Sequence, residues 1–186
     1  MARPRLTVPL IVGQAIQLAD SDSFEALSLS ALAERLGVRP SALYNHVTGL
    51  DDLQYLVAVA ATGNLTAAVR NAAVGTFGSR AVTAMGHAYR SFSLDHVGQF
   101  ASTLLPPRSN HDDLTRENRH LLDVFVAVFA ATGMAEHDSY LAARPTRSAL
   151  HGFLAPEHNS GTTDAHGAES THLLEALQRG LMNAGT

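Results

Sequence analysis

Residues 27–48 constrain the fold of this chain more than any other segment. Gly37 follows a short apolar stripe at the point where a helix must end, because glycine adopts a positive φ without a steric penalty. Pro40 then suits the first turn of a second helix, and Val38 is the apolar residue that fills the corner. The pattern predicts a helix-turn-helix. The stripe before the corner consists of Leu29, Leu32, Ala33 and Leu36.

The second helix of this corner carries side chains suited to contacting DNA. The Asn45 amide matches N6 and N7 of adenine, and the short Ser41 and Ala42 allow close approach to the major groove. Tyr44 and His46 are placed for phosphate oxygens, which position a protein without reading sequence. The alternative is an ordinary helical corner on a protein that never meets DNA. The predicted contact set is Ser30, Arg39, Ser41, Ala42, Tyr44, Asn45, His46 and Thr48.

The rest of the chain is predicted to be helical. No segment alternates for long at period two, and no Asn-Gly or Asp-Gly pair marks a hairpin. We therefore expect an all-α protein of about nine helices, in which Ser28 or Ser30 caps the first helix of the corner. Besides the two helices of the corner, the expected helices are 8–19, 51–71, 80–95, 98–104, 112–132, 138–155 and 168–182.

These elements predict two domains. A helix-turn-helix head occupies residues 1–50 and a C-terminal body residues 51–186, with the helix at about 51–71 connecting the two. Pro145 stands inside one expected helix, so that helix either kinks or begins there.

Composition excludes several classes of protein. The chain contains no cysteine, which rules out disulfides and thiol catalysis and is compatible with the expected cytoplasmic location. No run reaches the roughly 18 apolar residues of a membrane span, so no membrane partner is expected. The apolar residues at 8–19 fit helical spacing rather than a signal peptide.

Neither an enzyme nor a metal site is expected. The ten histidines form no His-x-x-x-His pair on one helix, and the chain is predicted to hold no metal and no cofactor. No Gly-x-Ser-x-Gly segment is present, and a small helical hydrolase, with His151 as its test residue, is a distant alternative.

The amino-acid sequence of the predicted helix-turn-helix matches a known family pattern. It reads LAERLGV at 32–38, SALYNHV at 41–47 and DDL at 51–53, in order and at workable spacing. Residues 9–60 thus resemble the N-terminal domain of the tetracycline-repressor (TetR) family of bacterial transcription regulators. Later pieces at 88–94 and 147–153 are similar to a subgroup of that family whose C-terminal domain carries a His-Gly pair.

This resemblance implies a homodimeric regulator with a small-molecule effector. Two heads would reach successive major grooves about 34–36 Å apart, so the double-stranded operator should be palindromic. The resemblance favours a repressor that the effector releases from DNA. The helix at about 51–71 is expected to transmit the effect of ligand binding to the head. The rival interpretation is a helical ligand-binding or scaffolding protein that retains the corner but does not bind DNA.

Two sets of body residues follow from the resemblance. Helices 138–155 and 168–182 carry leucine stripes that would form a four-helix interface with a second copy. For each residue of the effector set, plain core packing is the alternative. The predicted interface is Leu150, His151, Leu154, Leu173, Leu174, Leu177 and Leu181. The candidate effector lining is Met85, Tyr89, Phe92, Phe100, Leu104, Phe125, Val128 and Phe129.

The head carries little positive charge. Residues 1–50 contain four arginines and four acidic residues, and Leu50 stands where the family usually has a phosphate-binding lysine. Since phosphate neutralisation supplies much of the affinity for DNA, we expect weak non-specific binding with a shallow salt dependence. Arg3 and Arg5 either reach an adjacent minor groove or merely start the chain with soluble residues.

Overall fold

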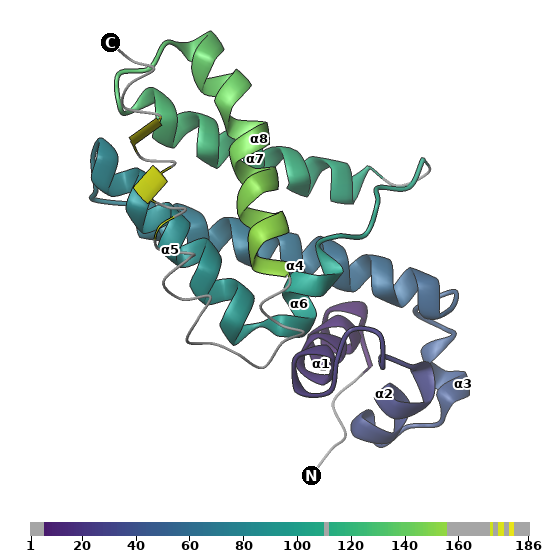
Figure 1. The fold of residues 1–186 in the computed structure, drawn as a ribbon. Coiled ribbons are helices and arrows are strands. Elements are labelled where there is room, and N and C mark those ends of the chain that lie inside the picture. The colour runs from purple at the N-terminus through teal and green to yellow at the C-terminus, as the bar shows by residue number, and fades with distance from the viewer. Residues whose placement is uncertain (1–5, 110–111, 156–171, 173–174, 177–178, 181–186) are drawn as a thin grey trace. The chain divides into compact units, whose positions relative to one another are not determined.

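The computed structural model of the chain describes residues 6–109, 112–155, 172, 175–176 and 179–180. These residues are helical and contain no strand, which confirms the all-α prediction (Figure 1). The complete helices are α1 (Val8–Ser21), α2 (Leu29–Leu36), α3 (Pro40–Leu43), α4 (Leu50–Ala73), α5 (Ser79–Asp95), α6 (Val97–Ser102), α7 (Asp113–Ala130) and α8 (Glu136–Leu154). Of the last expected helix, residues 172, 175–176 and 179–180 are described, and they are helical.

The chain forms two compact units, and α4 contributes to both. The first unit comprises residues 1–62 with 96–114, and the second comprises residues 63–95 with 115–186. The first unit therefore includes α6, which comes from the middle of the sequence. The sequence predicts that residues 1–50 form a DNA-binding head and residues 51–186 a C-terminal body. This functional division stays a prediction.

One hydrophobic core holds α1, α2, α3 and the start of α4 together. The apolar stripe of α1 faces this core, as its helical spacing predicts, and Ala101 and Leu105 pack against it from the α6 region. The buried members are Ile11, Ala15, Leu18, Ala19, Phe24, Leu27, Leu32, Ala33, Leu43, Val47, Leu53 and Val57.

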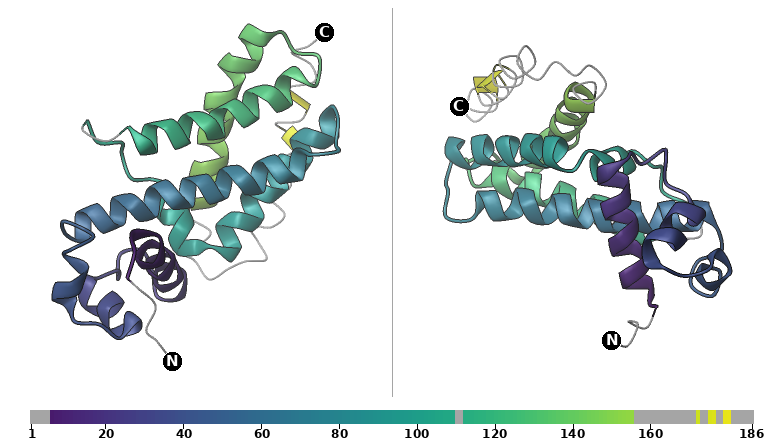
Figure 2. Two further views of the ribbon diagram at one scale, coloured as in Figure 1. Left: turned by 180° about the vertical axis from the view of Figure 1, so that it is seen from behind. Right: turned by 90° about the horizontal axis from the view of Figure 1, so that it is seen from below.

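The C-terminal end of α1 packs directly on α6 (Figure 2). Gly98 permits this approach, because a Cβ at that position would collide with the backbone carbonyl of Ala19. The Asp20 carboxylate accepts hydrogen bonds from the backbone N–H of Gln99 (2.9 Å) and from its side-chain amide (2.7 Å). Asp20 thereby caps the N-terminus of α6 from another helix.

Tyr55 attaches the segment after α6 to the start of α4. Its hydroxyl accepts a hydrogen bond from the backbone N–H of Leu114 at 3.2 Å. The guanidinium of Arg108 lies over the Tyr55 ring, 5.2 Å from its centroid, and donates to the Asp51 carbonyl at 2.9 Å. Residues far apart in the sequence thus brace the first turns of α4.

The second unit contains α5, α7, α8 and the end of α4. Tyr89 of α5 is fully buried, and its hydroxyl forms a 3.0 Å hydrogen bond with Nδ1 of His151 on α8. Burial raises the pKa of Tyr89 to about 12, although the charge of Arg147 partly opposes that rise. Phe125 packs edge-on against Tyr89. α8 begins at Glu136 and continues through Pro145, so Pro145 does not start the helix.

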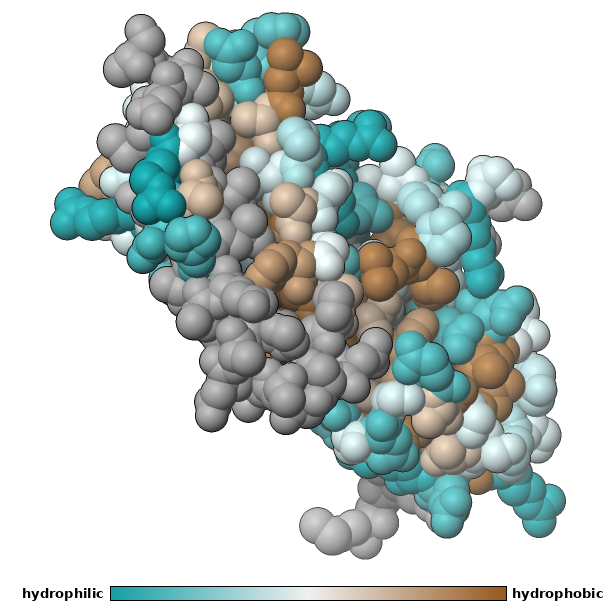
Figure 3. All heavy atoms as spheres, in the orientation of Figure 1, coloured by the Kyte–Doolittle hydropathy of each residue, from teal (hydrophilic) through white to brown (hydrophobic). Residues whose placement is uncertain are grey.

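Hydrophilic and hydrophobic residues are interspersed on the face drawn in Figure 3. Within the described residues, no helix is both long and apolar enough to cross a membrane. The exposed large hydrophobic residues are Tyr44, Val74, Phe77, Val97, Leu104, Tyr140 and Leu141.

Candidate DNA interface and effector pocket

The first helix of the corner has well-defined ends. The Ser28 hydroxyl accepts a hydrogen bond from the backbone N–H of Ala31 (3.2 Å), so Ser28 is the N-cap of α2 and Ser30 is left exposed. Gly37 ends the helix in the left-handed region with φ 64°, and the N–H of Val38 returns to the Ala33 carbonyl at 3.0 Å. This closure fixes the turn that the sequence predicts.

The second helix of the helix-turn-helix, α3, is shorter than expected. α3 comprises only Pro40–Leu43, after which the N–H groups of His46 and Val47 both bond to the Leu43 carbonyl, at 2.8 and 3.0 Å. Leu43 and Val47 are buried in the core of the first unit. Because they lie four residues apart, they anchor one side of this segment and turn the remaining side chains outward.

The structure leaves the whole predicted DNA-contact set accessible. Tyr44 is 60% exposed, which is unusual for a large aromatic side chain in a single chain. Ala42 and His46 are partly buried. The exposed members of the set are Ser30, Arg39, Ser41, Tyr44, Asn45 and Thr48. Their contact with DNA stays a prediction.

The start of α4 stabilises the end of the helix-turn-helix through a hydrogen bond but contributes no positively charged side chain. The backbone N–H of Thr48 donates to the Asp52 carboxylate at 2.8 Å, which caps the helix entry. Between residues 6 and 62 the basic residues are Arg35 and Arg39. Arg35 donates to Gln14 (3.2 Å) and Gln17 (3.1 Å) of α1, so part of its hydrogen-bonding capacity is used within the head. Arg3 and Arg5 lie outside the described residues.

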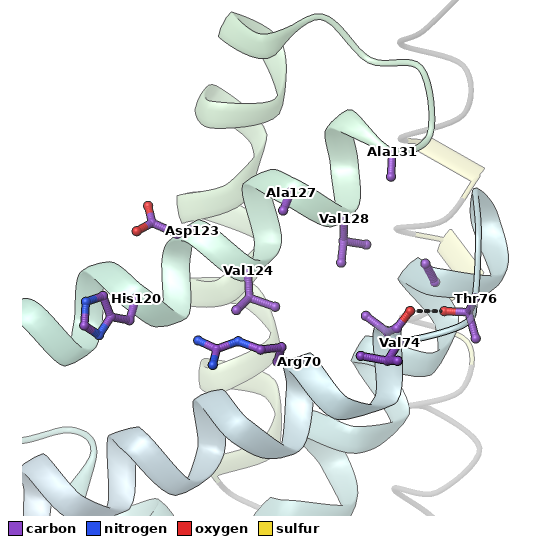
Figure 4. Close-up of a pocket in the computed structure, with 11 residues that line it drawn as sticks. Arg70, Val74, Thr76, His120, Asp123, Val124, Ala127, Val128 and Ala131 are labelled. Atoms are coloured by element: carbon purple, nitrogen blue, oxygen red, sulfur yellow. Dashed lines mark hydrogen bonds between the residues drawn. The ribbon is translucent and has the colours of Figure 1, made fainter.

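The second unit contains a pocket of about 490 Å³, within the usual range for small-molecule sites. It lies between the end of α4, the start of α5 and α7 (Figure 4). Arginine, histidine and aspartate line it together with small aliphatic residues. The full lining is Arg70, Ala73, Val74, Thr76, Ala81, His120, Asp123, Val124, Ala127, Val128 and Ala131.

The predicted effector lining and this pocket share one residue, Val128. Leu104 is exposed. The other six are buried among the core residues, namely Met85, Tyr89, Phe92, Phe100, Phe125 and Phe129. These six residues do not line the pocket described above, and both alternatives, effector lining and plain core packing, remain predictions for them. Sequence inspection missed Arg70, His120 and Asp123, since polar residues on an amphipathic helix look like a solvated face.

The predicted interface residues of α8 are already buried within one chain. Leu150, His151 and Leu154 pack inside the second unit, so they have little surface left to offer a partner. The exposed hydrophobic residues of α8 are instead Tyr140 and Leu141, near its start. The remaining predicted interface residues, Leu173, Leu174, Leu177 and Leu181, lie outside the residues whose side chains are described.

Comparison with known proteins identifies the class first. The chain is 31% identical over 159 residues to the HTH-type transcriptional regulator Rv0681 of Mycobacterium tuberculosis, covering 84% of this chain and 73% of that protein. It is 28% identical over 149 residues to the HTH-type regulator YobS of Bacillus subtilis, covering 80% and 77%. With an accessible helix-turn-helix in the first unit, the protein is a DNA-binding transcriptional regulator.

The family follows from the second half of the chain. Residues 82–181 match the family model described as the tetracyclin repressor-like C-terminal domain. The fold is also that of a variant of TetR from Acinetobacter baumannii solved in complex with minocycline, with a TM-score of 0.72 at 17% identity over 98% of this chain and 99% of that one. The chain belongs to the TetR family of transcriptional regulators.

Proposed function

We propose that the protein is a homodimeric repressor that leaves a palindromic operator when a small molecule binds its second unit. The outward face around α3 carries this proposal, because Leu43 and Val47 are buried while Tyr44 and Asn45 face solvent. On a two-fold dimer, two such faces would enter major grooves about 34–36 Å apart. A protein that acts on chromosomal DNA would work in the cytoplasm.

The effector part of the proposal has separate support. The second unit contains a pocket of suitable size, and the structurally similar TetR variant from A. baumannii was solved with a bound small molecule. An effector can shift operator affinity only if it binds one conformation of the protein more tightly than another. α4 is the proposed lever, because its first residues adjoin the helix-turn-helix and its last residues line the pocket.

The direct test is Tyr44→Ala in a gel-shift assay with DNA from the protein's own promoter. We expect a loss of operator binding of at least about tenfold, since one good contact contributes roughly 1–3 kcal/mol. Phe77→Ala is a matched control, because Phe77 is also a largely exposed aromatic residue (74%) but belongs to the second unit. Sedimentation should give the same dimer for both variants. Unchanged binding by Tyr44→Ala would refute the assigned interface.

A further inference from the structure

The chemistry of the pocket between α4, α5 and α7 indicates what kind of effector it takes. Most of its lining is small and aliphatic, with Val74 from α4 and its following turn, and Val124, Ala127 and Val128 from α7. The eleven lining residues include no Phe, Tyr or Trp, and the imidazole of His120 is the single ring among them. Away from Arg70 and His120 the walls are aliphatic, and they therefore favour a flexible aliphatic chain over a flat aromatic molecule.

The polar residues of the pocket gather toward one end. Figure 4 shows Arg70 of α4 and His120 of α7 on the same side of the pocket, whereas Val128, Ala131 and Val74 lie toward the other side. A molecule that satisfies both ends has a polar head and an apolar tail.

Arg70 determines the charge of that head. Its guanidinium is a cation with five N–H donors, and it forms no hydrogen bond or ion pair with the other described residues. A guanidinium that lines a pocket is matched best by a carboxylate, which accepts two parallel N–H···O bonds.

Neighbouring carboxylates limit how much negative charge the pocket tolerates. Asp123 lines the same end, and Glu117 lies 3.6 Å from Nδ1 of His120. Because the Asp123 carboxylate lines the pocket together with Arg70, a dianionic head such as a phosphate monoester would be repelled more strongly than a monoanion. A single carboxylate can pair with Arg70 at a smaller electrostatic cost.

We propose that this pocket binds a straight-chain aliphatic monocarboxylate, with the carboxylate at Arg70 and the chain along the valine and alanine residues. This inference rests on the proposed effector-sensing role and specifies the ligand class of the same pocket.

The test compares four head groups on one ten-carbon chain by titration calorimetry with the full-length protein, below the micelle concentration of each compound. Decanoate should bind at least about tenfold more tightly than decanol, decyltrimethylammonium or decyl phosphate. Equal affinity for all four, or preference for another head group, would overturn the proposal.

Two variants test the two ends of the pocket. Arg70→Gln should reduce decanoate affinity to the level of decanol, whereas Arg144→Gln, which changes an exposed arginine on α8, should leave it unchanged. Ala127→Trp should abolish decanoate binding by filling the apolar end. Circular dichroism checks that each variant is folded. Full decanoate affinity in both Arg70→Gln and Ala127→Trp would place the ligand elsewhere.

Failure of the ligand class can be distinguished from failure of the sensing role. The same compounds are added to the operator complex in a gel-shift assay. Decanoate that binds through Arg70 but leaves the operator complex intact would refute effector sensing and retain the ligand class. Release of the operator by an unrelated compound that still acts on Arg70→Gln would retain sensing and refute the class.

Discussion

Single residues decide how closely the helices of the first unit approach. Gly98 is an example, because its hydrogen atom faces the backbone of α1 where any side chain would meet the Ala19 carbonyl. Glycine here is required by a close backbone approach rather than by an unusual φ, since the positive-φ glycines among the described residues are Gly37, Gly75, Gly78 and Gly133.

We therefore predict that Gly98→Ala destabilises the protein by about 3 kcal/mol or more, at the upper end of the cost of overpacking. Gly13→Ala is the matched control, because Gly13 lies within α1 and a Cβ there would meet nothing within 4 Å. It should be neutral or stabilise the helix by up to about 1 kcal/mol. Urea unfolding measures both. Equal stability of the two variants would contradict the close contact.

The raised pKa of Tyr89 leads to a second prediction about a single residue, the pH dependence of stability. Its pKa rises from 10.0 in the unfolded chain to about 12 in the fold, so the folded protein retains its proton longer. This contribution to stability is fully present below pH 10 and is lost as the pH rises from 10 through 12. At pH 11 the loss should be about 1.4 kcal/mol.

Comparison with Tyr89→Phe isolates that contribution. The variant should be less stable than the wild type at pH 8, by about 1–3 kcal/mol, because the buried hydrogen bond to His151 is lost. Between pH 8 and pH 11 the difference in unfolding free energy should shrink. A difference that stays constant with pH would show that the raised pKa does not contribute to stability.

At the scale of elements, α6 depends on α1 for its N-terminal cap. α6 has six residues, too few to be stable alone, and its own N-cap residue, His96, makes no side-chain cap bond. Asp20 supplies the missing acceptor for the backbone N–H of Gln99. The N-terminal helix α1 is thus held against a helix from the middle of the chain.

We predict that Asp20→Ala destabilises the first unit by about 1–2 kcal/mol, the usual cost of losing a helix cap. Asp22→Ala should change stability by less than about 0.5 kcal/mol, because Asp22 is exposed and its carboxylate accepts only a local bond from Ser21 at 3.1 Å. Hydrogen exchange of the α6 amides reports the effect directly. Unaltered protection in Asp20→Ala would rule out the capping role.

At the scale of the whole molecule, the scarcity of positive charge on the head limits non-specific attraction to DNA. If Arg35 and Arg39 on each of two heads neutralise one phosphate each, the logarithm of affinity should fall with the logarithm of salt at a slope of about −4. Binding titrations between 50 and 200 mM salt measure this slope. A value near −10 would show that further arginines, such as Arg108, also contact the backbone.

The sequence by itself determined the local features of this protein. Ser28, Gly37 and Pro40 place the helix-turn-helix correctly because caps, left-handed glycines and N-terminal prolines act within a few residues. The helical period likewise predicts α1 and α4 to within two residues at either end. The early end of α3 at Leu43 was missed, since the burial of Leu43 and Val47 overrides local preference there.

Only the tertiary structure determined which residues distant in the sequence contact one another or line the same pocket. The aromatic residues expected around an effector are buried, while Arg70, His120 and short aliphatic residues line the pocket between α4, α5 and α7. The packing of α6 on α1, in which Gly98 approaches the Ala19 backbone and Asp20 caps α6, could not be predicted from the sequence either. A pocket is the space that remains after whole helices have packed, and a backbone contact depends on where two helices meet. The periodicity of a single helix specifies neither feature, because both depend on how several helices pack together.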